Sequence, residues 1–74
     1  MSGTALAHGL RRFGYRIVRQ SGSHIRLTLE APPEHHLTIP GHSELKAGTL
    51  AAILALVCAR LNMSREDVLK ALDL

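Results

Sequence analysis

Between His24 and Glu30, hydrophobic and polar residues alternate without interruption. This two-residue period is typical of a β-strand that has one face on a hydrophobic core and the other in water. Two weaker strands are predicted beside it, over residues 15–20 and 36–39. Pro40 ends the second of these, because proline cannot donate the hydrogen bond that a strand requires. Connections rich in Ser, Gly and Pro separate the three segments, so short antiparallel strands are expected.

Helical spacing appears before and after these strands. Ser2 can cap a first helix, whose hydrophobic residues recur every three or four positions and which Gly14 terminates. A longer helix is predicted from Gly48 or Thr49 to Leu61, because its hydrophobic residues form one continuous stripe. The stripe consists of Leu50, Ile53, Leu54, Val57, Cys58 and Leu61.

A short last helix is predicted to begin at Ser64, where Ser64 and Asp67 resemble a capping box and Met63 can pack on Val68. The resulting order of helix, three strands, helix and short helix predicts an α+β fold with an α-β-β-β-α layout. Its helices would cover one face of a three-stranded antiparallel sheet. A chain of 74 residues is expected to form one domain, residues 1–74, with little room for an enclosed cleft. Any chemistry is therefore expected on an open surface.

The strand pattern also predicts which side chains face water. If Ile25, Leu27 and Leu29 face the helices, the alternate side chains of that strand face outward. The predicted outward residues of the three strands are Arg16, Val18, Gln20, His24, Arg26, Thr28, Glu30, His36 and Thr38. The open face of the sheet is thus expected to gather histidine, arginine and hydroxyl groups.

The chain carries nine Lys and Arg against six Asp and Glu, a net charge of +3, together with five histidines. This balance favours a nucleic acid or an acidic protein as the partner. The single cysteine, Cys58, excludes an internal disulfide and a cysteine-based zinc site, and its helical context indicates a buried core thiol. No apolar run reaches the roughly 20 residues of a membrane span and no signal-peptide pattern is present, so a cytoplasmic location without membrane contact is expected.

Two segments resemble a known family. The segment Gly14-Tyr15-Arg16-Ile17-Val18-Arg19-Gln20-Ser21-Gly22-Ser23-His24 is similar to the glycine-aromatic start and Arg-Gln-x-Gly-Ser-His signature of HicA-like (YcfA-type) mRNA interferase toxins of type II toxin–antitoxin systems. The run Thr38-Ile39-Pro40-Gly41-His42, followed by Leu45-Lys46-x-Gly48-Thr49-Leu50 and Ile53-Leu54, resembles the second signature of that family. Both motifs occur in order, and the resemblance covers nearly the whole chain.

The resemblance implies a double-stranded-RNA-binding-domain-like fold, ribosome-independent cleavage of mRNA and neutralisation by a HicB-like antitoxin. It also places the family's catalytic histidine at His24. The first helix departs from the family, because Ala5, Ala7 and His8 stand where relatives often carry a lysine or an acidic residue. That departure affects the contribution of the first helix to binding, and it leaves the two motifs intact.

RNA can be cleaved without a metal or other cofactor, because its own 2′-hydroxyl is a nucleophile beside the phosphate. The reaction needs a base, an acid and positive charge, and a histidine with a pKa near 6.5 can serve as base or acid at neutral pH. His24 is the predicted catalytic residue; the alternative is that it merely opens an exposed strand. The backbone of a Gly-Ser turn can approach a phosphate closely, and basic side chains can stabilise the charge. The residues expected to contact RNA are Arg16, Gly22, Ser23, Arg26 and Lys46.

The other histidines have alternative interpretations. His36 is either a second acid or base on the same face or a solvated strand residue, and His42 either assists or binds the backbone of its loop. A zinc site made of His24, His36 and His42 is a further alternative, although no ligand spacing on one element supports it. His8 and His35 are expected at the surface.

The long helix has few charges on the side away from its hydrophobic stripe, which predicts either a partner interface or an alanine-rich surface. The residues of this helix patch, proposed for homo-oligomer contact, are Ala52, Ala55, Leu56 and Ala59. Two rival functions remain: a non-catalytic RNA-binding module of the same fold, and a subunit with only protein–protein contacts. Phe13 and Tyr15 are the only aromatic residues of the Phe, Tyr and Trp class and both look structural, which argues against base stacking on the sheet.

Overall fold

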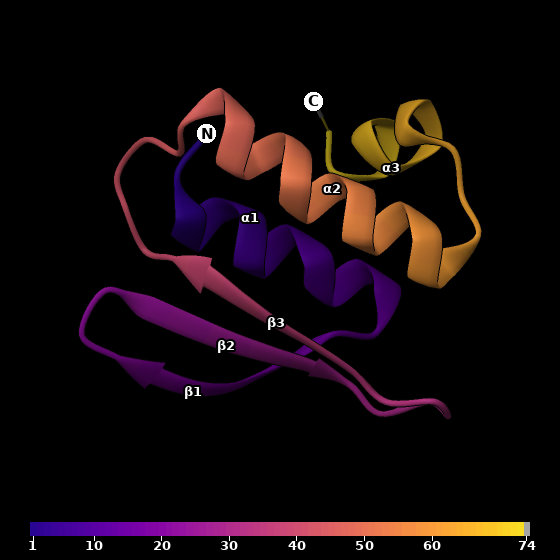
Figure 1. The fold of residues 1–74 in the computed structure, drawn as a ribbon, viewed down its shortest axis with the longest axis horizontal. Coiled ribbons are helices and arrows are strands. Elements are labelled where there is room, and N and C mark those ends of the chain that lie inside the picture. Colours follow the sequence, from indigo (N-terminus) through magenta and orange to yellow (C-terminus); the bar gives the residue numbers. More distant parts are fainter. Residues whose placement is uncertain (74) are drawn as a thin grey trace.

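The computed structural model describes residues 1–73 and contains one three-stranded sheet and three α-helices. The elements are α1 (Gly3–Leu10), a 3-10 turn η1 (Arg11–Phe13), β1 (Arg16–Ser21), β2 (His24–Leu29), β3 (His35–Pro40), α2 (Ala47–Leu61) and α3 (Arg65–Ala71). This order confirms the predicted α-β-β-β-α layout with a short extra helix (Figure 1). Strand and helix ends differ from the predicted ends by one or two residues.

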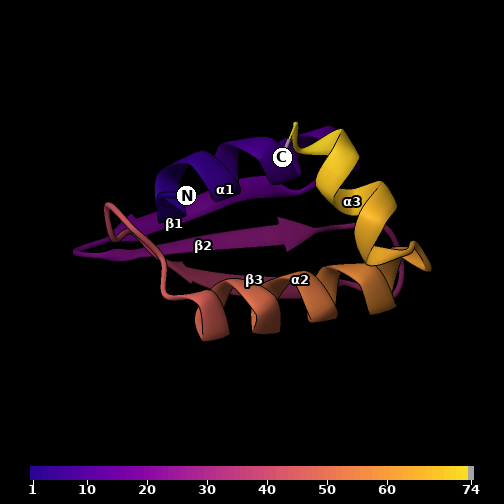
Figure 2. The same ribbon diagram turned by 90° about the horizontal axis from the view of Figure 1, so that it is seen from above.

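The strands are antiparallel in the order β1-β2-β3, and α1 and α2 cover the same face of the sheet (Figures 1 and 2). The short helix α3 packs against α2 at one end of this helical layer. Among residues 1–73, no helix lies on the opposite face of the sheet. Within residues 1–73, no single helix is long and apolar enough to cross a membrane, and α2 and α3 reach that length and composition only as a pair bent by 101°.

The core lies between the sheet and the helices α1 and α2, on the face that the alternation of β2 predicts. Ile25, Leu27 and Leu29 are buried against α1 and α2. The other core positions come from α1, β3, α2, α3 and the residues beside them, and include Leu6, Leu10, Tyr15, Leu37, Ile39, Leu54, Val57, Val68 and Leu72. Cys58, predicted to be a buried core thiol, is half-buried and packs against this core from its edge.

Side-chain caps define the starts of α1 and α3, as the sequence predicts. Ser2 Oγ accepts a hydrogen bond from the backbone N–H of Ala5 at 3.0 Å, and Ser64 Oγ accepts one from that of Asp67 at 3.1 Å. Gly14 ends the first helical segment with a φ of 97°, a left-handed conformation that favours glycine. These helix ends are predictable from the sequence because a capping hydrogen bond joins residues only a few positions apart.

The register of β1 corrects the predicted alternation. Ile17 pairs with Leu27, but the next paired residue is Arg19, opposite Arg26, so Val18 is an extra residue in a bulge. Directly opposed residues share a face of the sheet. Arg19 therefore joins the open face, and Gln20, which was expected there, pairs with the core residue Ile25 instead. A regular two-residue period could not anticipate the inserted position.

Candidate functional site

The open face of the sheet carries its polar side chains in three rows that cross the strands. We number them from the hairpin between β1 and β2. Row one is Ser21, His24 and Pro40; row two is Arg19, Arg26 and Thr38; row three is Arg16, Thr28 and His36. Members of a row are opposed Cα partners and therefore share one face. Three residues of the predicted site, His24, Arg26 and Arg16, thus stand in successive rows.

A tight turn positions His24. β1 ends at Ser21 and β2 begins at His24, so only Gly22 and Ser23 connect them. Gly22 has a φ of 58°, which suits the first central position of a two-residue hairpin turn of type II′. A Cβ atom on Gly22 would meet no atom within 4 Å, so backbone conformation and not crowding requires glycine there. The result is an exposed His24 at the tip of the sheet.

Residues of the second sequence motif lie directly against the end of the first. Pro40 lies directly opposite His24, and the backbone N–H of Gly41 donates a hydrogen bond to the carbonyl oxygen of Ser23. The following loop is held by the start of α1, where the N–H of Gly3 donates to the carbonyl oxygen of His42 at 2.9 Å. The His24 end of the first motif and the Pro40–His42 part of the second, distant in the sequence, therefore lie together at one end of the molecule.

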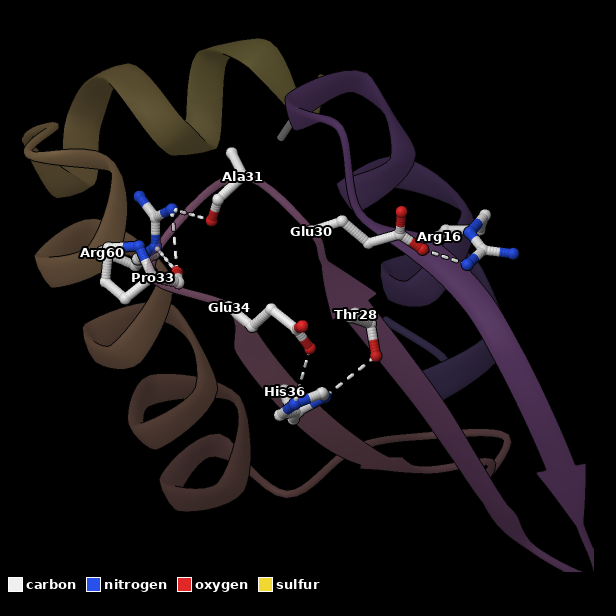
Figure 3. A network of polar contacts seen from close by, with 8 residues as sticks. All are labelled: Arg16, Thr28, Glu30, Ala31, Pro33, Glu34, His36 and Arg60. Atoms are coloured by element: carbon white, nitrogen blue, oxygen red, sulfur yellow. Dashed lines mark hydrogen bonds and ion pairs between the residues drawn. The ribbon is translucent and has the colours of Figure 1, made fainter.

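His36 has a partner at each ring nitrogen, as Figure 3 shows. Its Nδ1 lies 2.9 Å from Thr28 Oγ1, and its Nε2 lies 3.4 Å from Glu34 Oε2. Thr28, expected in water, is only 7% exposed, which corrects the prediction. It occupies the central strand between Arg16 and His36, whose longer side chains flank it. His36 stands four residues along the strands from His24, about 13 Å, too far for both to act on one phosphate.

The basic side chains of the site differ in their partners. Arg16 forms an ion pair with Glu30 on the open face (Figure 3). Arg19 and Arg26 are exposed, and neither has an ion pair or side-chain hydrogen bond within residues 1–73. Lys46 is also exposed and precedes α2 without a side-chain cap. Among the arginines of the open face, the two without an ion pair within residues 1–73 therefore both stand in row two, next to the row of His24.

His35 is not a surface residue, contrary to the prediction. It is half-buried, and its Nδ1 lies 2.6 Å from the hydroxyl oxygen of Tyr15. Burial, the positive charge of Arg60 and the neighbouring His36 lower the pKa of His35. Arg60 also donates to the carbonyl oxygens of Ala31 and Pro33, at 2.9 and 3.1 Å (Figure 3). This group holds the β2–β3 connection against α2 and has a structural role.

The remaining predicted features can also be placed. His8 is exposed, as expected, and so is the side chain of His42. No group of three His, Cys, Asp or Glu side chains within residues 1–73 is placed to hold a metal ion, so His24, His36 and His42 do not form the zinc site considered above. The described residues enclose no pocket, and the site is an open surface.

The helix patch on α2 is exposed as predicted. Leu56 is 53% exposed, and Ala52, Ala55 and Ala59 are exposed as well. Leu54 and Val57 of the same helix point into the core. The patch is therefore a separate surface of the molecule from the open face of the sheet.

Arg19 is the site residue that sequence reasoning missed. A regular two-residue period would put Arg19 on the same covered face as Ile17. Only the bulge at Val18 brings Arg19 opposite Arg26. The signal that could have identified it is its place at the head of the Arg-Gln-x-Gly-Ser-His segment, which ends at His24.

Comparison with known proteins gives one family. The family model described as "HicA toxin of bacterial toxin-antitoxin" matches residues 6–57. The match extends from α1 through all three strands and into α2, and so contains both motifs and all three rows. No curated protein and no solved structure matches the chain.

Proposed function

This chain belongs to the HicA toxin family, and we propose that it is a metal-independent endoribonuclease that cleaves mRNA with His24 as its single catalytic residue. Family membership makes it the toxin of a toxin–antitoxin pair with an antitoxin as partner. The observation that carries the proposal is the position of His24. It is exposed at a tight turn, beside unneutralised arginines, with no side-chain partner within residues 1–73.

The chemistry needs only the groups present on this face. The RNA 2′-oxygen attacks the adjacent phosphorus, the bond from phosphorus to the 5′-oxygen breaks, and a 2′,3′-cyclic phosphate remains. His24 in its neutral form accepts the 2′-hydroxyl proton, and the leaving 5′-oxygen takes a proton from the imidazolium or from water. Arg26 stabilises the charge on the phosphorus centre, and the turn of Gly22 and Ser23 lets backbone approach the phosphate. Lys46 and Arg16 are proposed as further contacts to the RNA backbone.

The test compares two histidine variants of the purified protein on a labelled RNA. His24→Ala is expected to lower the cleavage rate by about 10²–10⁴-fold. His8→Ala is the matched control, because His8 is equally exposed but lies on α1, in the layer that covers the other face of the sheet. Circular dichroism verifies that both variants are folded. A His24→Ala protein that cleaves at the wild-type rate overturns the assignment.

Two further outcomes separate the alternatives. Cleavage is expected to persist in EDTA, and its loss on chelation would replace the proposal with a metal-dependent reaction. If the wild-type protein binds RNA without cleaving it, the chain is instead a non-catalytic RNA-binding module that recognises backbone shape.

The antitoxin is proposed to be an acidic, HicB-like protein that occludes His24. Its carboxylates would occupy the phosphate positions and pair with Arg26 and Lys46, and with Arg16 after displacement of Glu30. The helix patch would serve as a second contact or as a homo-oligomer seam. Titration of the isotope-labelled toxin with its antitoxin is expected to shift the amide resonances of rows one and two. Shifts confined to α2 would contradict occlusion of the site.

A further inference from the structure

We propose that Arg19 and Arg26 together form a phosphate-binding site beside His24, created by the β-bulge at Val18. The inference deepens the proposed RNA-cleaving function and rests on it for the identity of the ligand as RNA. It assigns a role to Arg19, which the strand pattern had placed on the covered face of the sheet. The site would take one phosphate group of the RNA backbone.

The first argument is the opposition of two like charges. Arg19 and Arg26 are direct cross-strand partners, and both are exposed. Like charges placed directly opposite each other destabilise a sheet. No carboxylate within residues 1–73 pairs with either guanidinium, whereas Arg16 in the next row is neutralised by Glu30. A bound anion between the two arginines would convert this repulsion into attraction to a common ligand.

The second argument is reach. Row two lies two residues along β2 from His24, which is about 6.6 Å. Each guanidinium presents a planar fork of N–H donors that can bind a phosphate through two oxygens. A phosphate held over row two therefore lies against His24 at its edge. If Val18 were paired regularly, with no bulge, the same sequence would place Arg19 opposite Ile25, toward the helices, and leave Arg26 alone.

The third argument is the distribution of charge along the open face. Beyond row two, Glu30 pairs with Arg16 and Glu34 lies against His36, so that half of the face holds its own acidic groups. Phosphates are therefore favoured at the hairpin half of the face over the other half. The RNA strand would therefore cross the β-strands at rows one and two and not follow them along the sheet. Tyr15 and Phe13 pack on the core, so the contacts would be to phosphates and not to stacked bases.

The experiment measures binding separately from cleavage. All proteins carry His24→Ala, and a short single-stranded RNA of mixed sequence is titrated at several salt concentrations. Arg19→Gln and Arg26→Gln are each expected to weaken binding and to reduce the slope of log affinity against log salt by about 0.7. Arg65→Gln is the matched control: it removes the same charge from an exposed arginine, but one on α3, in the helical layer that covers the other face of the sheet. The slope of log affinity against log salt is expected to change much less in this control than in Arg19→Gln or Arg26→Gln.

A gain of function provides the complementary variant. Glu30→Gln should release Arg16 to the RNA and increase the slope, by up to about 0.7. Equal effects of Arg19→Gln and Arg65→Gln on the salt slope would overturn the inference, as would no effect of Arg19→Gln. If the wild-type protein cleaves RNA but Arg19→Gln leaves the salt slope unchanged, the proposed phosphate site is wrong and the proposed function stands. If Arg19→Gln and Arg26→Gln reduce the salt slope but His24→Ala does not alter cleavage, the phosphate site stands and the assignment of His24 as the catalytic residue is wrong.

Discussion

The hydroxyl oxygen of Tyr15 lies 2.6 Å from Nδ1 of His35, and the two rings meet edge to face at an interplanar angle of 62°. Burial raises the pKa of Tyr15, so the phenol keeps its proton and can donate it to a neutral imidazole. The pKa of His35 is lowered by burial first and by Arg60 and His36 second. The folded protein therefore favours the neutral ring of His35.

This relationship predicts a pH-dependent stability. Because the folded pKa of His35 lies below its unfolded value of about 6.5, the unfolded chain binds the proton first as the pH falls. The stabilisation is fully present above about pH 6.5 and is lost as the pH falls through the lower folded pKa. Urea unfolding at about pH 8 and about pH 5 measures the loss, which His35→Gln should reduce. His8→Gln, an exposed control, should leave it unchanged; an equal response of both variants contradicts the prediction.

A second prediction concerns the contact between α1 and the end of β3. A Cβ atom on Gly3 would lie 1.7 Å from the carbonyl oxygen of Pro40, a backbone atom that cannot rotate away. Gly3→Ala is therefore expected to lower the free energy of unfolding by about 1–3 kcal/mol. Gly48→Ala is the control, because a Cβ there meets nothing within 4 Å and the residue is helical. It should raise stability by about 0.4–1 kcal/mol in the same denaturant titration.

The bulge itself can be tested by deletion. Removal of Val18 would leave Arg16, Ile17 and Arg19 as consecutive residues opposite Thr28, Leu27 and Arg26, which is a regular antiparallel register. Val18 is 43% exposed, so little buried surface is lost. We expect the deletion variant to fold and to retain RNA binding at its wild-type salt slope. Deletion of Leu27, a fully buried residue paired with both neighbouring strands, is the control and should unfold the protein. A Val18 deletion that abolishes binding while the protein stays folded would contradict the register.

The fourth prediction addresses the helix patch on α2. Because Leu56 is 53% exposed, Leu56→Glu is expected to leave the fold and the cleavage rate intact and to weaken self-association or antitoxin binding. Gel filtration and a binding titration measure the two effects. Leu54→Glu, at a core position of the same helix, should unfold the domain and provides the contrast. If Leu56→Glu changes neither association nor antitoxin binding, the patch is an alanine-rich surface only.

Much of the architecture follows from the amino-acid sequence alone. The alternation of β2 identifies Ile25, Leu27 and Leu29 as core residues, and the caps at Ser2 and Ser64 mark two helix starts. These features are predictable because each depends on a period or a hydrogen bond between residues a few positions apart. The outward orientation of the His24 side chain follows from the same period.

The surroundings of His24 depend on contacts between distant segments. The bulge at Val18 is visible only in the pairing of β1 with β2, and it alone sets Arg19 opposite Arg26. Thr28 is buried because side chains of both neighbouring strands flank it, and no property of β2 by itself reveals that. Likewise, the half-burial of His35 requires Tyr15, twenty residues earlier. The sequence therefore determined the elements and their inner faces, whereas the tertiary structure decided which charges on the open face are neutralised and which remain available to a phosphate. The reason is physical: local periodicity orients a side chain, but only packing between strands supplies its neighbours.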